Sequence, residues 1–138
     1  MDSLPGSLSY VLDCITADDT VYFSPLIAGD TIVMSTESIL VQENVTFLAN
    51  PDDHITIVGN SSAPTIQVTP SGTLTAVGLH FVAGAGTQAA AVFNKGEVHF
   101  SDCEILSNPD CVSNVNLITN SGIMTIDDNC VIKECDGN

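Results

Sequence analysis

Residues 65–81 read TIQVTPSGTLTAVGLHF, and the same pattern returns as AVFNKGEVHFSDCEI in residues 91–105 and as LITNSGIMTIDDNCVI in residues 117–132. The central glycines of these three segments lie 24 and 26 residues apart. A repeat of this length, built from short runs of alternating apolar and polar residues, is typical of a solenoid. The rest of the chain is expected to extend or cover the stack that this stretch, Thr65 to Lys133, forms.

Aligned residues of the repeat form columns. They are Gly72, Gly96 and Gly122; Leu74, Val98 and Met124; Ala76, Phe100 and Ile126; and Gly78, Asp102 and Asp128. In a parallel β coil each residue lies about 4.8 Å above its counterpart one period earlier, so like residues stack. The columns predict a right-handed parallel β-helix of about five turns, with Leu74, Val98 and Met124 in its core. Residues 1–138 are expected to form one all-β domain.

The sequence before residue 65 continues the coil. Short strands between Asn, Asp, Gly and Pro residues are predicted at 20–23, 31–34, 38–41, 45–48 and 54–58. The residues predicted to point inward are Val45, Phe47, Ile55 and Ile57, because alternate side chains of a strand face opposite sides. A β-sandwich is disfavoured, since the one Asp-Gly pair, a common hairpin turn, lies at the C-terminus and joins no strands.

A short amphipathic helix is predicted at residues 6–17, with Ser7 as its N-cap. Its apolar stripe consists of Leu8, Val11, Leu12 and Ile15. The helix is expected to cover the first turn, which would otherwise expose apolar side chains and unpaired strand edges. The turns then occupy residues 20–133, and residues 134–138 form an open C-terminal end with no second cap.

The charge of the chain is strongly negative. Seventeen Asp and Glu residues stand against two Lys and no Arg, for a formal net charge of −15. Such a surface repels phosphate backbones and anionic lipids, so neither nucleic-acid binding nor membrane binding is expected. The chain has no run of 18 apolar residues, and residues 1–6 lack the features of a signal peptide. The chain is therefore either cytosolic or a mature fragment without its leader.

Several stretches resemble a known family. GSLSYVLDCI (6–15) and DTVYFSPLIAGDTI (19–32) are similar to the "GSLR-x-A" cap helix and the "DTI-x-FSP-L-x-G-x-TI" opening of secreted and surface β-helix modules of bacteria, many exported by the type IX route. GTLTAVGLHF (72–81) and NKGEVHF (94–100) resemble the later turns of that family. Ser9 stands where many relatives have Arg. The resemblance implies that the chain belongs to the pectate-lyase-like superfamily and is located outside the cell. It implies no activity, because a fold does not determine a function.

No catalytic centre is predicted, and the protein is not expected to be an enzyme. A lyase of this superfamily needs a basic residue near the uronate, and only Lys95 and Lys133 are available. A glycosidase needs two carboxylates about 5–9.5 Å apart. Asp102 with Asp128, or Asp127 with Asp128, are the candidates. Aspartates that follow a strand are better explained as turn residues that cap backbone N–H groups.

Neither a metal ion nor a cofactor is predicted. His54, His80 and His99 are expected to face outward, with His80 and His99 near one another on adjacent turns. The acidic pair Asp52–Asp53 and residues 127–129 could contact calcium, but the glycine-rich nonapeptides of calcium-binding β-rolls are absent.

An ice-binding face would need a flat array of threonines. Thr56, Thr75 and Thr125 are expected to share an outward face, which His99 interrupts.

The five cysteines leave at least one thiol free or paired between chains. Cys111 and Cys135 are predicted to lie in loops of adjacent turns, and they are the candidate disulfide. Cys103 is expected to point into the core as a small apolar residue, and Cys14 to pack in the cap. Cys130 has no obvious partner.

The leading hypothesis is a non-enzymatic extracellular structural module, either adhesive or filament-forming. The incomplete last turn around Val131, Ile132 and Cys135 presents unpaired backbone groups and is the expected assembly end. Either the chain is a segment of a larger secreted protein, in which neighbouring β-helix segments are its partners, or its open end docks on other copies, stacked head to tail. The alternative is a domain that binds or cleaves polysaccharide, in which surface glycans are the partners.

Overall fold

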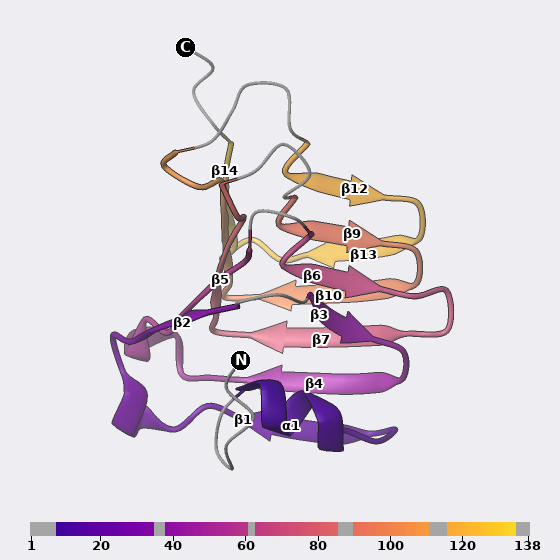
Figure 1. Ribbon diagram of the computed structural model, residues 1–138, viewed down its shortest axis with the longest axis horizontal. Helices are drawn as coiled ribbons and strands as arrows, with labels where there is room; N and C mark the ends of the chain where they lie inside the picture. The colour runs from indigo at the N-terminus through magenta and orange to yellow at the C-terminus, as the bar shows by residue number, and fades with distance from the viewer. Residues whose placement is uncertain (1–7, 35–37, 61–62, 86–89, 111–115, 135–138) are drawn as a thin grey trace.

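The protein is a parallel β solenoid with one short α-helix near its N-terminus (Figure 1). The computed structural model describes residues 8–34, 38–60, 63–85, 90–110 and 116–134. The helices are α1 (Leu8–Cys14) and the 3-10 helices η1 (Pro25–Ile27) and η2 (Pro51–Asp53). The strands are β1 (Asp19–Tyr22), β2 (Thr31–Val33), β3 (Ile39–Val41), β4 (Asn44–Leu48), β5 (Thr56–Val58), β6 (Ile66–Val68), β7 (Thr73–Val77), β8 (His80–Val82), β9 (Val92–Asn94), β10 (Glu97–Ser101), β11 (Glu104–Leu106), β12 (Ile118–Asn120), β13 (Ile123–Ile126) and β14 (Val131–Lys133).

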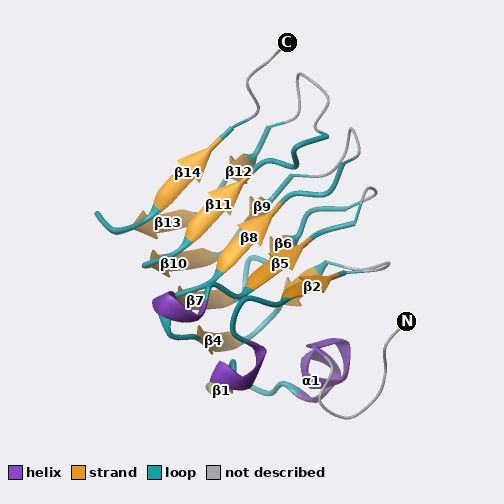
Figure 2. Cartoon of the chain, turned by 90° about the vertical axis from the view of Figure 1, so that its left-hand side faces the viewer, coloured by secondary structure: helices purple, strands orange, loops and turns teal. Residues whose placement is uncertain are grey.

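Successive strands belong to three different sheets. Sheet A has the order β1-β4-β7-β10-β13, sheet B the order β2-β5-β8-β11-β14, and sheet C the order β3-β6-β9-β12. Every pairing is parallel, so the chain passes from sheet A to B to C and then begins the next turn (Figures 1 and 2). Four turns have all three strands, and the described part of the fifth turn consists of β13 and β14. The predicted parallel β coil is confirmed.

The register confirms the columns predicted from the repeat. Val98 pairs with Leu74 on one side and with Met124 on the other. Phe100 pairs in the same way with Ala76 and Ile126. The period seen in the sequence is therefore the stacking period of sheet A.

Left-handed backbone marks the corner between sheets A and B. Gly78 has φ +76° and Asp102 has φ +52° at equivalent corners of the third and fourth turns. The first two turns insert η1 and η2 at this corner, each followed by a left-handed residue, Gly29 with φ +80° and His54 with φ +48°. His54 ends η2 in a left-handed conformation, which is why the strand predicted from residue 54 begins only at Thr56.

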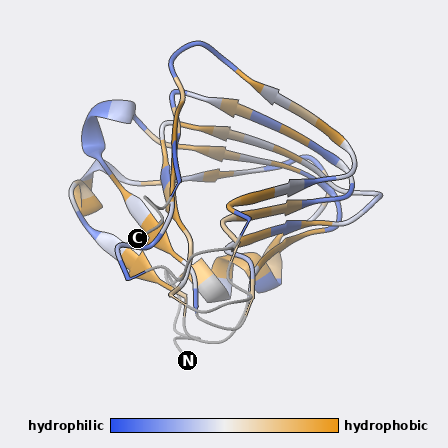
Figure 3. Ribbon diagram, turned by 90° about the horizontal axis from the view of Figure 1, so that it is seen from above, coloured by the Kyte–Doolittle hydropathy of each residue, from blue (hydrophilic) through white to orange (hydrophobic). Residues whose placement is uncertain are grey.

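The core is a column of side chains between the three sheets. Phe47, Phe81 and Phe100 lie among aliphatic residues and are at most 2% exposed. The predicted inward residues Val45, Phe47, Ile55 and Ile57 are all buried. Figure 3 shows the alternation of apolar and polar residues along the strands that produces this division.

Helix α1 lies against the first turn, as predicted, and belongs to the same core. Leu8 is buried, while Leu12 and Ile15 are partly buried and pack against the core. The helix occupies the region below β3 in Figure 1, where a preceding turn would place a strand of sheet C. Cys14 is exposed, so the expectation that it packs in the cap is wrong. It lines a surface depression together with Val11 and Ile15. Residues 6 and 7 of the predicted helix, including the predicted N-cap Ser7, lie outside the described residues, and residues 15–17 follow the end of α1.

Candidate functional site: the open fifth turn

The inward side chains of the fifth turn are much less covered than those of the turn before. Ile126 is 36% exposed and Ile132 is 42% exposed, whereas their counterparts Phe100 and Ile105 are 2% and 0% exposed. Met124 is likewise half-buried, although Val98 below it is buried. The positions that form the core lower in the coil therefore become an apolar end surface in the last turn.

The strands at this end each have one hydrogen-bonded neighbour among the described residues. In β13, the N–H groups of Ile123 and Asp127 donate to the carbonyls of Gly96 and Phe100 in the turn below. Backbone groups of a parallel strand point alternately to its two sides, so those of Met124 and Ile126 face the open side. Among the described residues, the outer side of β13 and β14 is a sheet edge that can pair with another strand.

Two apolar side chains are exposed on the outer face of the fifth turn. Ile123 is 61% exposed and follows the column of Thr73 and Glu97. Val131 is 42% exposed and follows the column of His80 and Glu104 in sheet B. Two of the predicted assembly residues, Val131 and Ile132, thus lie exposed at the end of the coil, and Cys135 lies outside the described residues.

A ladder of asparagines leads to this end. Asn94 is 1% exposed, and its Nδ2 donates to Asn120 Oδ1 at 2.8 Å and to the carbonyl of Ile123 at 2.9 Å. Its Oδ1 accepts the N–H of Gly96 at 2.9 Å. Asn120 repeats the last contact, because its Oδ1 accepts the N–H of Gly122 at 3.2 Å. This ladder was not predicted from the sequence, although an asparagine stands two residues before each of the last two glycines of the repeat.

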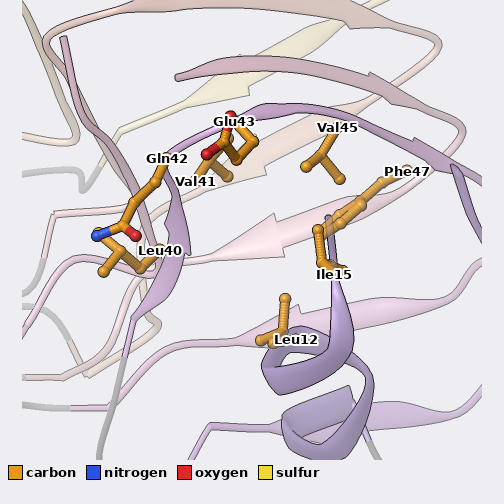
Figure 4. Close-up of a pocket in the computed structure, with 8 residues that line it drawn as sticks. All are labelled: Leu12, Ile15, Leu40, Val41, Gln42, Glu43, Val45 and Phe47. Atoms are coloured by element: carbon orange, nitrogen blue, oxygen red, sulfur yellow. The ribbon is translucent and has the colours of Figure 1, made fainter. Parts of the chain in front are cut away.

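A small cavity of about 90 Å³ lies between helix α1 and the coil. Leu12 and Ile15 line it from the helix side, and Val45 and Phe47 line it from β4 (Figure 4). Sites for small-molecule ligands usually have volumes of about 300–1,000 Å³. This cavity is too small for a sugar ring with its neighbours, and it is best described as a packing gap under the cap.

The carboxylate of Asp127 stabilises the corner of the fifth turn through hydrogen bonds. It accepts hydrogen bonds from the hydroxyl of Ser101 at 2.5 Å and from the N–H of Asn129 at 3.0 Å. The hydrogen bond from Ser101 is the main reason that the pKa of Asp127 is below its ordinary value. Asp102 has the left-handed backbone of the same corner one turn earlier. These contacts agree with the interpretation of these aspartates as turn residues.

The predicted relation between His80 and His99 is wrong. His80 lies in sheet B, in register with Thr56 and Glu104, whereas His99 lies in sheet A. The ring near His80 is that of His54, with a centroid distance of 5.5 Å. Each of the two strand histidines has a carboxylate nearby, with His80 Nδ1 at 3.5 Å from Glu104 and His99 Nε2 at 2.8 Å from Glu97. Within the described ranges no three His, Cys, Asp or Glu side chains are grouped to hold a metal ion.

The predicted outward array of Thr56, Thr75 and Thr125 is wrong for one of its three members. Thr75 and Thr125 flank His99 in sheet A, as predicted, but Thr56 belongs to sheet B. The column in sheet A instead continues downward through Thr46.

Both lysines are exposed. The Nζ of Lys95 lies 5.4 Å from the centroid of the Phe93 ring, which is an ordinary cation–π distance on a solvent-facing surface.

Two cysteines occupy one inward column. Cys103 and Cys130 immediately precede the paired residues Glu104 and Val131 of sheet B, so Cys130 lies above Cys103. Cys103 is fully buried, as predicted, and its thiol donates to the carbonyl of Ala76 at 3.3 Å. Burial raises its pKa to about 11 and also raises the pKa of Cys130. Both predicted disulfide partners, Cys111 and Cys135, lie outside the described residues.

Alkylation by iodoacetamide at pH 8 is expected to separate the cysteines. A rise in pKa from 9.0 to about 11 lowers the thiolate fraction of Cys103 roughly 100-fold. Cys103 should therefore react roughly 100-fold more slowly in the native protein than after unfolding, whereas the exposed Cys14 should be labelled readily in the native protein, as read by peptide mass mapping over time. Since the folded pKa is raised, the contribution of Cys103 to stability is full below pH 9 and falls as the pH rises toward 11. Equal labelling of both residues in the native protein would contradict the burial of Cys103.

In the part of the chain that the structure describes, no helix has both the length and the apolar character needed to cross a membrane. Comparisons of the chain with family models, curated proteins and solved structures gave no match. The parallel β solenoid is therefore established by the strand pairing of the chain itself.

Proposed function

We propose that the protein is a non-enzymatic structural module, which works by end-on stacking of β turns on its open fifth turn. The observation that carries this proposal is the exposure of core positions at that end, with Ile126 and Ile132 uncovered where Phe100 and Ile105 are buried. Covering these side chains would remove apolar surface from water and stabilise the assembly by about 25 cal/mol per Å² of buried apolar area. A strand placed there would also pair the free backbone groups of β13 and β14.

The proposed setting is the outside of a cell, as part of a surface, adhesive or filament structure. The support for this setting is the resemblance of residues 6–15 and 19–32 to secreted β-helix modules of bacteria. Neither Asp127 nor the cavity beside α1 supports the polysaccharide alternative. Asp127 is held by hydrogen bonds within its corner, and the cavity beside α1 is too small for a sugar chain.

Helix α1 gives the stacking a direction. It takes the place of a sheet C strand below the first turn, whereas among the described residues β1 and β2 each have one hydrogen-bonded neighbour. Identical copies arranged head to tail could therefore pair through sheets A and B, but they would bring a helix against the sheet C side of the open end. Two copies of the purified chain can also bring their open ends together, related by two-fold symmetry, which ends at a dimer.

Sedimentation velocity from about 1 µM to about 1 mM tests the proposal. The wild-type chain is expected to form a dimer with rising concentration, and the double variant Ile126→Lys, Ile132→Lys to dimerise at least about 10-fold more weakly, because two lysines at the apolar end repel their copies. Leu26→Lys is the matched control, since Leu26 is 93% exposed in η1, away from the open end.

Two results would argue against end-on stacking. One is a wild-type chain that stays monomeric over the whole range. The other is a double variant that associates as strongly as the Leu26→Lys control.

A further inference from the structure

We infer that the native partner of the open end is a parallel β turn of another polypeptide segment, which carries Asn-x-Gly in register with Asn120 and Gly122. This inference rests on the proposed stacking function and adds the chemistry that would select the partner. It follows from the contacts that the fourth turn makes with the fifth, because the fifth turn presents the same groups again.

The contacts of Asn94 show which hydrogen bonds one turn makes to the next. Its side chain donates to Asn120 Oδ1 and to the carbonyl of Ile123, and its own carbonyl accepts the N–H of Ser121 at 2.9 Å. Two residues on, the carbonyl of Gly96 accepts the N–H of Ile123 at 2.8 Å. One Asn-x-Gly segment thus makes four hydrogen bonds to the Asn-x-Gly segment above it and to the strand that follows.

Asn120 and Gly122 are placed to repeat these contacts. The Oδ1 of Asn120 caps the N–H of Gly122, as Asn94 caps Gly96, and this fixes the orientation of the amide. The Nδ2 of Asn94 is occupied by the turn above, but among the described residues no group accepts from the Nδ2 of Asn120. By equivalence with the turn below, the carbonyls of Asn120 and Gly122 face the open side.

The glycine column restricts the partner further. A Cβ on Gly122 would lie 2.0 Å from the carbonyl oxygen of Gly96, and one on Gly96 would lie 2.3 Å from that of Gly72. Backbone therefore stacks directly on backbone at this corner, and a partner turn needs glycine above Gly122 for the same reason. With asparagine two residues earlier, the required pattern is Asn-x-Gly followed by a strand with alternating apolar residues.

The first turn of this chain does not carry that pattern. In the same columns it has Val41 below Val68 and Asn94, and Glu43 two residues after Val41. Valine cannot accept from the Nδ2 of Asn120, and a glutamate side chain does not fit the glycine column. The parallel turn that fits the open end is therefore supplied by a different segment than the first turn of a second copy.

A peptide with the sequence of residues 91–100, AVFNKGEVHF, is a direct probe, because it carries the pattern that already stacks on Asn120 and Gly122 from below. Its matched control has the changes Asn94→Leu and Gly96→Val. Titration into the 15N-labelled protein should shift the amide signals of Ile123–Ile126 and slow their hydrogen exchange. The control peptide should bind at least about 10-fold more weakly.

The protein variant Asn120→Asp sharpens the test. Aspartate keeps the oxygen atoms that accept from Gly122 and Asn94 but removes the Nδ2 donor, so the fold is retained and peptide binding falls at least about 10-fold. Asn129→Asp makes the same chemical change at an exposed position of the same turn and should leave binding unchanged.

The outcomes distinguish the partner from the function. If both peptides bind the end equally, or if Asn120→Asp has no effect, the Asn-x-Gly rule is wrong while end-on stacking stands. If the protein forms a dimer through its open end and neither peptide displaces it, a second copy is the partner and the inference is overturned. If neither peptide binds and sedimentation shows no association at the open end, the stacking function fails as well.

Discussion

Gly78→Ala is expected to lower the free energy of unfolding by about 3–5 kcal/mol, which would leave little folded protein if the stability is in the usual range. Two causes add. Gly78 has φ +76°, a left-handed conformation that costs an alanine about 1–2 kcal/mol. A Cβ there would also lie 2.2 Å from the carbonyl oxygen of Ala49 and 2.9 Å from the nitrogen of Pro51, so the backbone of the turn below has to move. Urea unfolding followed by circular dichroism measures the change.

Gly29→Ala is the matched control for this prediction. Gly29 has φ +80°, but a Cβ at this position would have no atom within 4 Å. Only the backbone conformation is penalised, and a loss of about 1 kcal/mol is expected. Equal losses for the two variants would mean that the close approach of Gly78 to Ala49 contributes nothing to stability.

Ile105→Ala and Ile132→Ala are expected to differ strongly, although the two residues pair in one inward column. Ile105 is 0% exposed, so removing its side chain leaves a cavity and costs about 2–5 kcal/mol. Ile132 is 42% exposed in the free protein, and its replacement should cost less than about 1 kcal/mol. The two values come from the same urea unfolding experiment at a protein concentration low enough to keep the chain monomeric.

The difference between these two variants also reports on stacking. When a turn covers the open end, Ile132 takes the surroundings that Ile105 has now, so Ile132→Ala should weaken the association while Ile105→Ala leaves it unchanged as long as the protein is folded. A cost of Ile132→Ala near that of Ile105→Ala in the free monomer would contradict an open fifth turn.

The stacking of the turns could be predicted because one period controls it. Val98 lies between Leu74 and Met124 in the structure because the spacing of the glycines sets the register of sheet A. The distribution of strands within a turn could not be predicted, since it depends on the corner lengths. Thr56 and Thr75 both lie in segments with the alternating pattern of a strand, but these segments belong to different sheets.

The length of the corner between β13 and β14 explains why the period of the sequence did not predict the neighbour of Cys130. In sheet A the residues of the fifth turn follow those of the fourth by 26 positions, as Glu97 and Ile123 show, but in sheet B the interval is 27, as Glu104 and Val131 show. The additional residue lies in the corner that Asp127 stabilises. A fixed period therefore places Cys103 beside Asn129, and only the structure places it below Cys130.

The cap at one end and the free edge at the other also imply an order of folding. Helix α1 packs against the core of the first turns, so we expect the folding nucleus to lie near the N-terminus and to include β1 and β4. Each later turn contacts mainly the turn before it, and structure in such a chain can grow from a nucleus by one repeat at a time. A chain that emerges N-terminus first, from a ribosome or through a secretion pore, would then fold in the direction of its emergence.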